Sequence, residues 1–253
     1  MMFSANLGFL WTEQDLPDAI RAAKAAGFDA VECHWPYDVE VSEVNAALAE
    51  TGLSMLGINT RRGDVARGEN GLTAVPGREA EARAFIDEAL EYAAKIGAAN
   101  VHVMAGFASG PAAHQTFVGN LRYACAKAAK TGQTILIEPL NHYDAPGYFL
   151  TTTAQAVAII KEVAAPNLKL MFDCYHVQLM EGDLSNRLTN LRKHIGHIQF
   201  AGVPARGEPD AGEVNYRHIF QLISNMGYQA PLGAEYRPAG RTEGGLGWMK
   251  SLT

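Results

Sequence analysis

The feature that most constrains the fold of this chain is the regular alternation of short apolar runs with longer amphipathic stretches. Apolar runs of four to seven residues predict buried strands, and apolar residues at helical spacing predict the helices that cover them. Several helical stretches end in a glycine, where a left-handed C-terminal cap is expected, and an apolar run then follows. These glycines are Gly27, Gly52, Gly97, Gly132 and Gly227.

The apolar runs number eight when residues 3–9 are counted as the first strand. A chain of 253 residues then has about 32 residues per strand-and-helix unit, as expected for a (β/α)₈ barrel of about 250 residues. We therefore predict an α/β fold, a single TIM barrel domain over residues 1–253. The other expected strands are 28–32, 53–59, 100–104, 134–138, 168–173, 195–200 and 232–235, and the expected helices include 16–26, 78–96, 117–130, 153–163 and 216–226.

A doubly wound open sheet is the alternative arrangement for alternating strands and helices. Folds of that kind commonly carry a glycine-rich phosphate loop between a strand and a helix. Neither GxGxxG nor GxxxxGK[ST] occurs at such a position in this chain. The barrel is therefore the favoured fold.

Composition excludes several classes of function. The net charge is -6 and no run of Lys or Arg exceeds two residues, so the basic surface of a nucleic-acid-binding protein is not expected. The three cysteines (Cys33, Cys125 and Cys174) lack CxxC spacing, which argues against a disulfide framework. No stretch of 18 apolar residues indicates a membrane span. We predict a cytoplasmic protein without nucleic-acid or membrane partners.

The polar residues that end the apolar runs are the candidates for chemistry. Active sites of these barrels form at the C-terminal ends of the strands, so such residues converge on one centre. In chain order they are Asn6, Glu32, Asn59, His102, Glu138, Asp173, Gln199 and Glu235.

Four of these residues, Glu138, Asp173, Gln199 and Glu235, would together form an oxygen-only site. Three carboxylates and an amide oxygen suit a hard divalent ion such as Mg²⁺ or Mn²⁺ better than zinc. The alternative is that each acid caps a strand or pairs with an arginine at the barrel rim. Clustered carboxylates repel one another without a cation, which favours the metal site.

Five short motifs stand out in the sequence, and they are Ile137 to Asn141, Phe172 to His176, His197 to Gly202, Gly212 to Tyr216 and Gly233 to Tyr236. These motifs resemble those of the hydroxypyruvate isomerase family, within the xylose-isomerase-like TIM barrel superfamily. The resemblance covers essentially the whole chain, and residues 242–248 are similar to the 2-oxo-tetronate isomerase branch.

The resemblance implies a role for each matching residue. Glu138, Asp173, Gln199 and Glu235 would bind a divalent metal ion, and Glu138 and Glu235 would also transfer the proton. His176 and Arg206 would contact the substrate. The related ketose 3-epimerases have histidine where this chain has Gln199, and this difference favours the isomerase branch.

Other polar residues are candidates for contacts with the substrate or for structural roles. His102 alternates with two valines, so it is either a structural barrel residue or a substrate contact, and we include it among the substrate-binding candidates. A substrate carboxylate needs a cationic or donor-rich partner, for which Arg61, Arg206, Arg237 and His102 are the candidates. His197 is expected to face the surrounding helices.

The predicted activity is isomerisation of a small hydroxylated 2-oxo acid, either hydroxypyruvate to tartronate semialdehyde or 2-oxo-tetronate to 3-oxo-tetronate. A metal ion would stabilise the enediolate while the glutamates move a proton between adjacent carbons. The expected partner is a small sugar acid, with no organic cofactor. A homo-oligomer is expected by analogy alone. The alternatives are a ketose 3-epimerase, an abasic-site endonuclease, which would need a histidine-rich zinc cluster and a basic groove, and a barrel that binds a sugar acid without catalysis.

Overall fold

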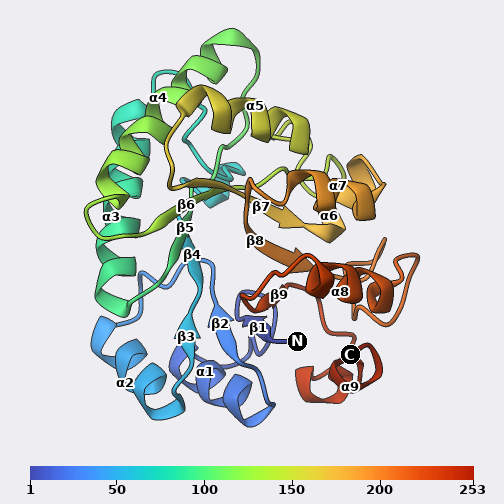
Figure 1. Cartoon of the computed structure of the whole chain (residues 1–253). Helices are drawn as coiled ribbons and strands as arrows, with labels where there is room; N and C mark the ends of the chain where they lie inside the picture. The colour runs from blue at the N-terminus through green and yellow to red at the C-terminus, as the bar shows by residue number, and fades with distance from the viewer.

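The computed structural model describes all 253 residues, and its parallel strands form a ring with the helices outside it (Figure 1). The ring has the order β3-β2-β1-β9-β8-β7-β6-β5-β4. The predicted TIM barrel is confirmed. The strands are β1 (Phe3–Asn6), β2 (Ala30–Glu32), β3 (Ser54–Met55), β4 (Gly57–Asn59), β5 (Asn100–His102), β6 (Thr134–Ile137), β7 (Leu168–Asp173), β8 (Ile195–Phe200) and β9 (Leu232–Ala234).

The third strand of the barrel is divided into β3 and β4 at Leu56. β3 pairs with β2, whereas β4 pairs with β5. The backbone N–H of Leu56 donates to the carbonyl of Val31, and the N–H of Cys33 donates to the carbonyl of Gly57. Through these bonds β2 and Cys33 beside it contact the chain on both sides of the break. β3 and β4 therefore count as one strand, and the nine strand segments make an eight-stranded barrel.

The helices follow their strands and cover the outside of the ring. Side-chain oxygens of Asp15, Thr152 and Asn215 cap α1, α5 and α8 by accepting from backbone N–H groups of the first turn. The helices are α1 (Leu16–Ala25), α2 (Val41–Thr51), α3 (Glu79–Ile96), α4 (Gly110–Ala128), α5 (Thr153–Val163), α6 (Cys174–Met180), α7 (Leu184–Leu191), α8 (Tyr216–Asn225) and α9 (Trp248–Ser251), with 3₁₀ helices η1 (Val65–Arg67) and η2 (Thr242–Gly245).

Two element boundaries differ from the sequence prediction by three residues or more. The helix expected from residue 117 begins at Gly110, where a proline in the first turn needs no backbone donor. The first strand ends at Asn6, and residues 7–13 form turns over the barrel mouth.

No helix in the structure is both long and apolar enough to cross a membrane.

A cluster of buried aromatic side chains packs beside β1 and β9. Trp248 is fully buried, and its ring packs edge-on against Phe3 at 4.9 Å and Phe200 at 5.3 Å between ring centres. The side chain of Trp11 donates to the carboxylate of Glu243 at 2.8 Å. The β1–α1 loop is thereby fastened to η2, which holds this part of the barrel mouth in place.

Candidate active site

The carboxyl ends of four consecutive strands bring together the four predicted metal-binding residues. Glu138 follows β6, Asp173 ends β7, Gln199 lies in β8 and Glu235 follows β9. The register aligns Asp173 with Gln199 and Gln199 with Gly233, so the strand ends are level. All four side chains are buried, with exposed fractions of 1–6%.

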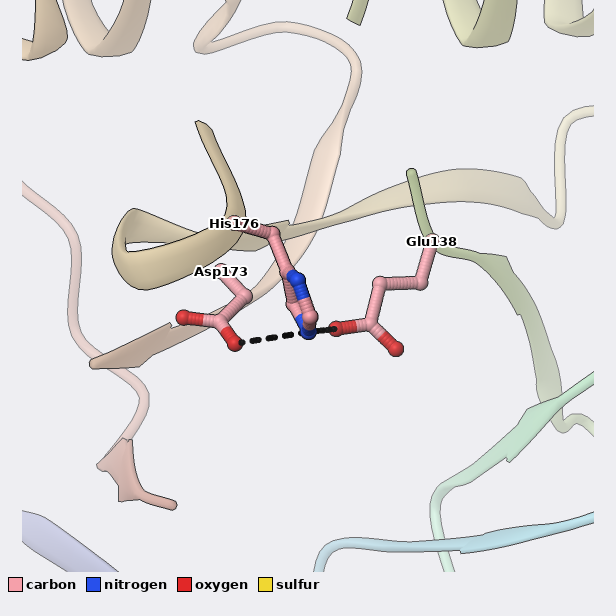
Figure 2. A group of neighbouring side chains, drawn as sticks. All are labelled: Glu138, Asp173 and His176. Carbon is pink, nitrogen blue, oxygen red and sulfur yellow. Dashed lines mark ion pairs between the residues drawn. The ribbon is translucent and has the colours of Figure 1, made fainter. Parts of the chain in front are cut away.

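Glu138, Asp173 and His176 form the cluster that could hold a cation (Figure 2). One potential ligand atom from each residue lies within 4.8 Å of the others. The carboxylates of Glu138 and Asp173 lie on either side of the His176 ring, with oxygens 3.9 and 3.6 Å from its Nε2. These separations are too long for good hydrogen bonds, so the three side chains lie close together without pairing.

The loop after β6 sets the protonation of His176. The backbone N–H of Asn141 donates to His176 Nδ1 at 3.0 Å, and the side-chain amide of Asn141 approaches the same atom at 2.7 Å. Burial, with Arg206 nearby, lowers the pKa of His176 to about 3, so the ring is neutral at pH 7. Because Nδ1 accepts, the proton is on Nε2. His176 therefore presents a donor to the site and would contact a substrate oxygen more readily than a metal ion.

Asp173 has two oxygens in different environments. Oδ1 accepts from the backbone N–H of Tyr175 at 2.8 Å and caps the N-terminus of α6. Oδ2 is buried without a hydrogen-bond partner. The cap fixes the carboxylate so that its free oxygen faces the cluster.

Glu235 has hydrogen-bond partners for both oxygens. Oε1 lies 2.9 Å from Asn6 Nδ2 and 2.9 Å from His34 Nε2, and Oε2 accepts from Arg206 Nη2 at 2.7 Å. Burial disfavours the charged carboxylate, but Arg206 and His34 outweigh it and hold the pKa of Glu235 at about 2. Glu235 is therefore ionised throughout the physiological range.

The pKa values of Glu138 and Asp173 are shifted in the opposite direction. Burial, followed by the charges of Glu235 and Asp173, raises the pKa of Glu138 well above its ordinary value. Burial also raises the pKa of Asp173 to about 7, although Arg206 opposes the shift. Without a bound cation this pair retains protons near neutral pH, whereas Glu235 does not.

Arg206, in the loop after β8, packs against two aromatic rings. Its guanidinium carbon is 4.6 Å from the ring centre of Phe9 and 4.9 Å from that of Tyr175. Nη1 lies 3.4 Å from an Asp144 oxygen, and Nη2 lies 3.7 Å from Asp173 Oδ2. The residue has a positive φ of 55°, a conformation that side chains rarely adopt, and this is often found at functional sites.

The chemistry of the donor set fits a hard divalent cation. Glu138 Oε1, Asp173 Oδ2 and Gln199 Oε1 are buried acceptors with no hydrogen-bond partner. Such atoms normally find a partner, because an unsatisfied buried polar group costs about 1–3 kcal/mol. A cation among the three oxygens would satisfy them together, so these residues fit Mg²⁺ or Mn²⁺.

The candidates for binding a substrate carboxylate fall into two groups. Arg206 contacts the site carboxylates, and both ring nitrogens of buried His102 are without partners, Nδ1 being 3.6 Å from Glu138. Arg61 is instead paired with Glu88 at 2.7 Å, and Arg237 is exposed. Only Arg206 and His102 are positioned to meet a ligand at this site.

One sequence expectation is wrong. His197 faces the barrel interior, where its Nε2 lies 2.6 Å from Glu32 Oε2, and both residues are buried. The register within β8 puts His197 and Gln199 on the same side of the strand, two residues apart. Sequence reasoning also missed the contact of His34 with Glu235, although the position of His34 directly after the second strand was a usable signal.

Comparison with known proteins supports the fold and the class. The profile described as the xylose isomerase-like TIM barrel matches residues 20–252. The chain belongs to this family. Among xylose isomerase-like proteins, the 2-oxo-tetronate isomerase of Cupriavidus necator is 47% identical over 252 residues, covering 98% of this chain and 97% of that protein. The hydroxypyruvate isomerase of Escherichia coli is 42% identical over 254 residues, covering 98% of each.

A solved structure superposes on this chain over nearly its full length. The crystal structure of an AP endonuclease, family 2, from Brucella melitensis superposes with a TM-score of 0.95 at 39% identity, covering 99% of this chain and 98% of that chain. The full-length matches to named isomerases confirm the predicted family and its enzyme class.

Proposed function

We propose that this xylose isomerase-like barrel moves a carbonyl group between adjacent carbons of a small hydroxylated 2-oxo acid. The reaction is either hydroxypyruvate to tartronate semialdehyde or 2-oxo-tetronate to 3-oxo-tetronate. The names of the similar isomerases support this substrate class. The structural observation that carries the proposal is the pair of buried glutamates, Glu138 and Glu235, with opposite pKa shifts beside three unsatisfied oxygens.

Glu138, Asp173, Gln199 and Glu235 would hold the divalent metal ion, Mg²⁺ or Mn²⁺. When bound, the ion would supply positive charge beside the substrate carbonyl and so make the neighbouring C–H more acidic. Gln199 is the neutral member of the set, which leaves three carboxylates to balance the charge. The supporting observation is that all but Glu235 carry an oxygen without a hydrogen-bond partner.

The two glutamates would carry the proton between carbons. One accepts the proton from the hydroxyl-bearing carbon to give an enediolate, and the pair returns it to the former carbonyl carbon. The hydroxyl proton moves to the former carbonyl oxygen, so the old hydroxyl becomes the new carbonyl group. Neighbouring residues keep the two acids unlike one another, because Arg206 and His34 hold Glu235 ionised while Glu138 is buried without a cationic partner. Such a difference suits a pair that exchanges one proton.

The substrate would be oriented by three further residues. The Nε2–H of His176 would donate to a hydroxyl or carbonyl oxygen. Arg206, the buried cation of the site, would meet the negative charge of the acid, and the unpartnered nitrogens of His102 would complete its hydrogen bonding. This cationic partner is the feature that favours a sugar acid over a neutral ketose.

The proposal is tested with purified protein that has been stripped of metal. Hydroxypyruvate and 2-oxo-tetronate are supplied separately with and without Mn²⁺ or Mg²⁺, and NMR follows the product and the incorporation of solvent deuterium. We expect metal-restored isomerisation of at least one acid. Absence of product and of exchange with either acid under both metals would refute the proposal.

The same experiment separates the alternatives. A ketose 3-epimerase would invert one carbon of a neutral ketose and leave the carbonyl where it was, so ketoses are included as substrates. A barrel that binds without catalysis would retain ligand binding and show the same readout when Glu138 is replaced by Gln. Location in the cytoplasm and assembly into a homo-oligomer remain predictions from the sequence.

A further inference from the structure

We propose that Glu32 is a positioning residue that fixes the side-chain amide of Gln199, so that its oxygen and not its nitrogen faces the metal site. The inference rests on the proposed function, in which Gln199 is a metal ligand. Glu32 itself has no role in the proton transfer. It ends β2, on the opposite side of the barrel from β7, and is 4% exposed.

The Glu32 carboxylate is fully engaged as a hydrogen-bond acceptor. Oε1 accepts from Gln199 Nε2 at 2.8 Å and from Asn6 Nδ2 at 3.1 Å. Oε2 lies 2.6 Å from His197 Nε2. Three side chains from two strands, β1 and β8, therefore meet on one buried acid.

This arrangement determines which way the amide points. The oxygen and nitrogen of a glutamine amide occupy similar volumes, so packing alone does not distinguish them. Glu32 Oε1 already accepts from the Asn6 amide, so a reversed Gln199 amide would place a second acceptor beside it while turning the NH₂ group toward the metal-binding oxygens. Holding the nitrogen with Glu32 leaves Gln199 Oε1 free, and this atom is one of the buried acceptors without a partner.

The backbone of β9 makes room for the contact. A Cβ atom on Gly233 would lie 2.6 Å from Glu32 Oε1 and 2.7 Å from Gln199 Cγ. Any larger residue would therefore push the two side chains apart. The absence of a side chain at Gly233 is what allows the Glu32 carboxylate and the Gln199 amide to make contact beside β9.

Glu32 also reaches a second member of the metal set through Asn6. The Asn6 side-chain amide donates to Glu32 at 3.1 Å and to Glu235 at 2.9 Å, while its oxygen accepts from the backbone N–H of Gly8. Asn6 is thus fixed at both ends. Glu32 therefore orients Gln199 directly and supports Glu235 indirectly, through Asn6.

The test measures Mn²⁺ affinity of the full-length protein by electron paramagnetic resonance of free Mn²⁺, together with thermal unfolding of the metal-free protein. We expect Glu32→Gln to weaken Mn²⁺ binding about 10- to 100-fold, the usual effect of removing a residue that orients a ligand. Gly233→Ala is expected to weaken binding in the same range without changing any charge. It also serves if Glu32→Gln does not fold.

Two matched controls separate positioning from general loosening of the barrel. His197→Gln keeps a donor to Glu32 and leaves the Glu32–Gln199 bond, so it should bind Mn²⁺ within threefold of the unchanged protein. Gly57→Ala places a methyl group on another barrel strand, where its nearest neighbour would be an ordinary 3.5 Å away. The exchange Glu32→Gln with Gln199→Glu restores a donor–acceptor pair and an oxygen toward the metal, and should recover most of the affinity.

The outcomes distinguish failure of this inference from failure of the proposed site. If Gln199→Ala weakens Mn²⁺ binding but Glu32→Gln and Gly233→Ala do not, Glu32 has no positioning role and the metal site stands. Equal losses in His197→Gln and Glu32→Gln would also overturn the inference. If Gln199→Ala binds Mn²⁺ normally, the proposed ligand set is wrong and this inference fails with it.

Discussion

Binding of Mn²⁺ to the metal-free protein at pH 6 should release between one and two protons. The pKa of Asp173 is raised to about 7 and that of Glu138 is raised well above its ordinary value, in both cases chiefly by burial. At a pH one unit below a pKa of about 7, about nine-tenths of that carboxyl is protonated. A metal ion binds the ionised carboxylate, so each retained proton must leave on binding.

The magnitude follows from the number of protons. Each displaced proton makes the apparent affinity rise about tenfold per pH unit, or ~1.4 kcal/mol, until the group ionises by itself. We therefore expect the affinity to rise about 10- to 100-fold between pH 5.5 and 6.5. His102, His176 and Glu235 add little, because their pKa values of about 4, about 3 and about 2 lie below this range.

Isothermal titration calorimetry measures the release directly. Titrations at pH 6 in two buffers with different ionisation enthalpies give the number of protons from the difference in observed heat. Glu138→Gln keeps an oxygen donor but has no proton to lose, so it should release about one proton fewer. Equal heats in both buffers, or an affinity that does not change between pH 5.5 and 6.5, would refute the assignment of retained protons to this pair.

Three further predictions concern single side chains. Glu235→Gln should lower turnover of the 2-oxo acid about 10²- to 10⁴-fold in steady-state assays, and turnover within threefold would contradict its role. The unfolding temperature should also fall, because buried Arg206 loses the charge of its 2.7 Å partner, so the assays are run well below it. Arg206→Lys loses the planar fork that reaches Glu235 and Asp144, so kcat/KM should fall by at least tenfold; an unchanged kcat/KM would remove Arg206 from substrate binding. Trp248→Ala empties a fully buried site and should lower the free energy of unfolding in urea by about 3–5 kcal/mol, whereas a loss under 1 kcal/mol would contradict its place in the core.

Much of the barrel and the composition of its mouth could be predicted from the sequence, because both follow from local patterns. Glu138, Asp173 and Glu235 each come at the end of an apolar run, and parallel strands place such residues at one end of the ring. Counting strands then gives the order of the residues around the site. Two strands, 168–173 and 195–200, have the predicted bounds.

The remaining features depend on contacts across the barrel that no local pattern records. Glu32 and His197 are separated by 165 positions in the chain, and their meeting depends on the stagger and closure of the whole ring. The tautomer of His176 depends on a backbone N–H in a neighbouring loop. The environment of Arg206 depends on Phe9, which lies in a turn where a strand was expected.

The packing of Phe9 and Tyr175 against Arg206 has a consequence for the anions that can bind. The two ring centres lie 4.6 and 4.9 Å from the guanidinium carbon, so apolar surface covers part of this cation. Nη2 and Nη1 already face Glu235 and Asp144, while Nε is a buried donor without a partner. An incoming acid must therefore share the cation with two carboxylates of the protein. Inhibitors for this site should be compact monoanions, because a second negative charge would lie close to those carboxylates.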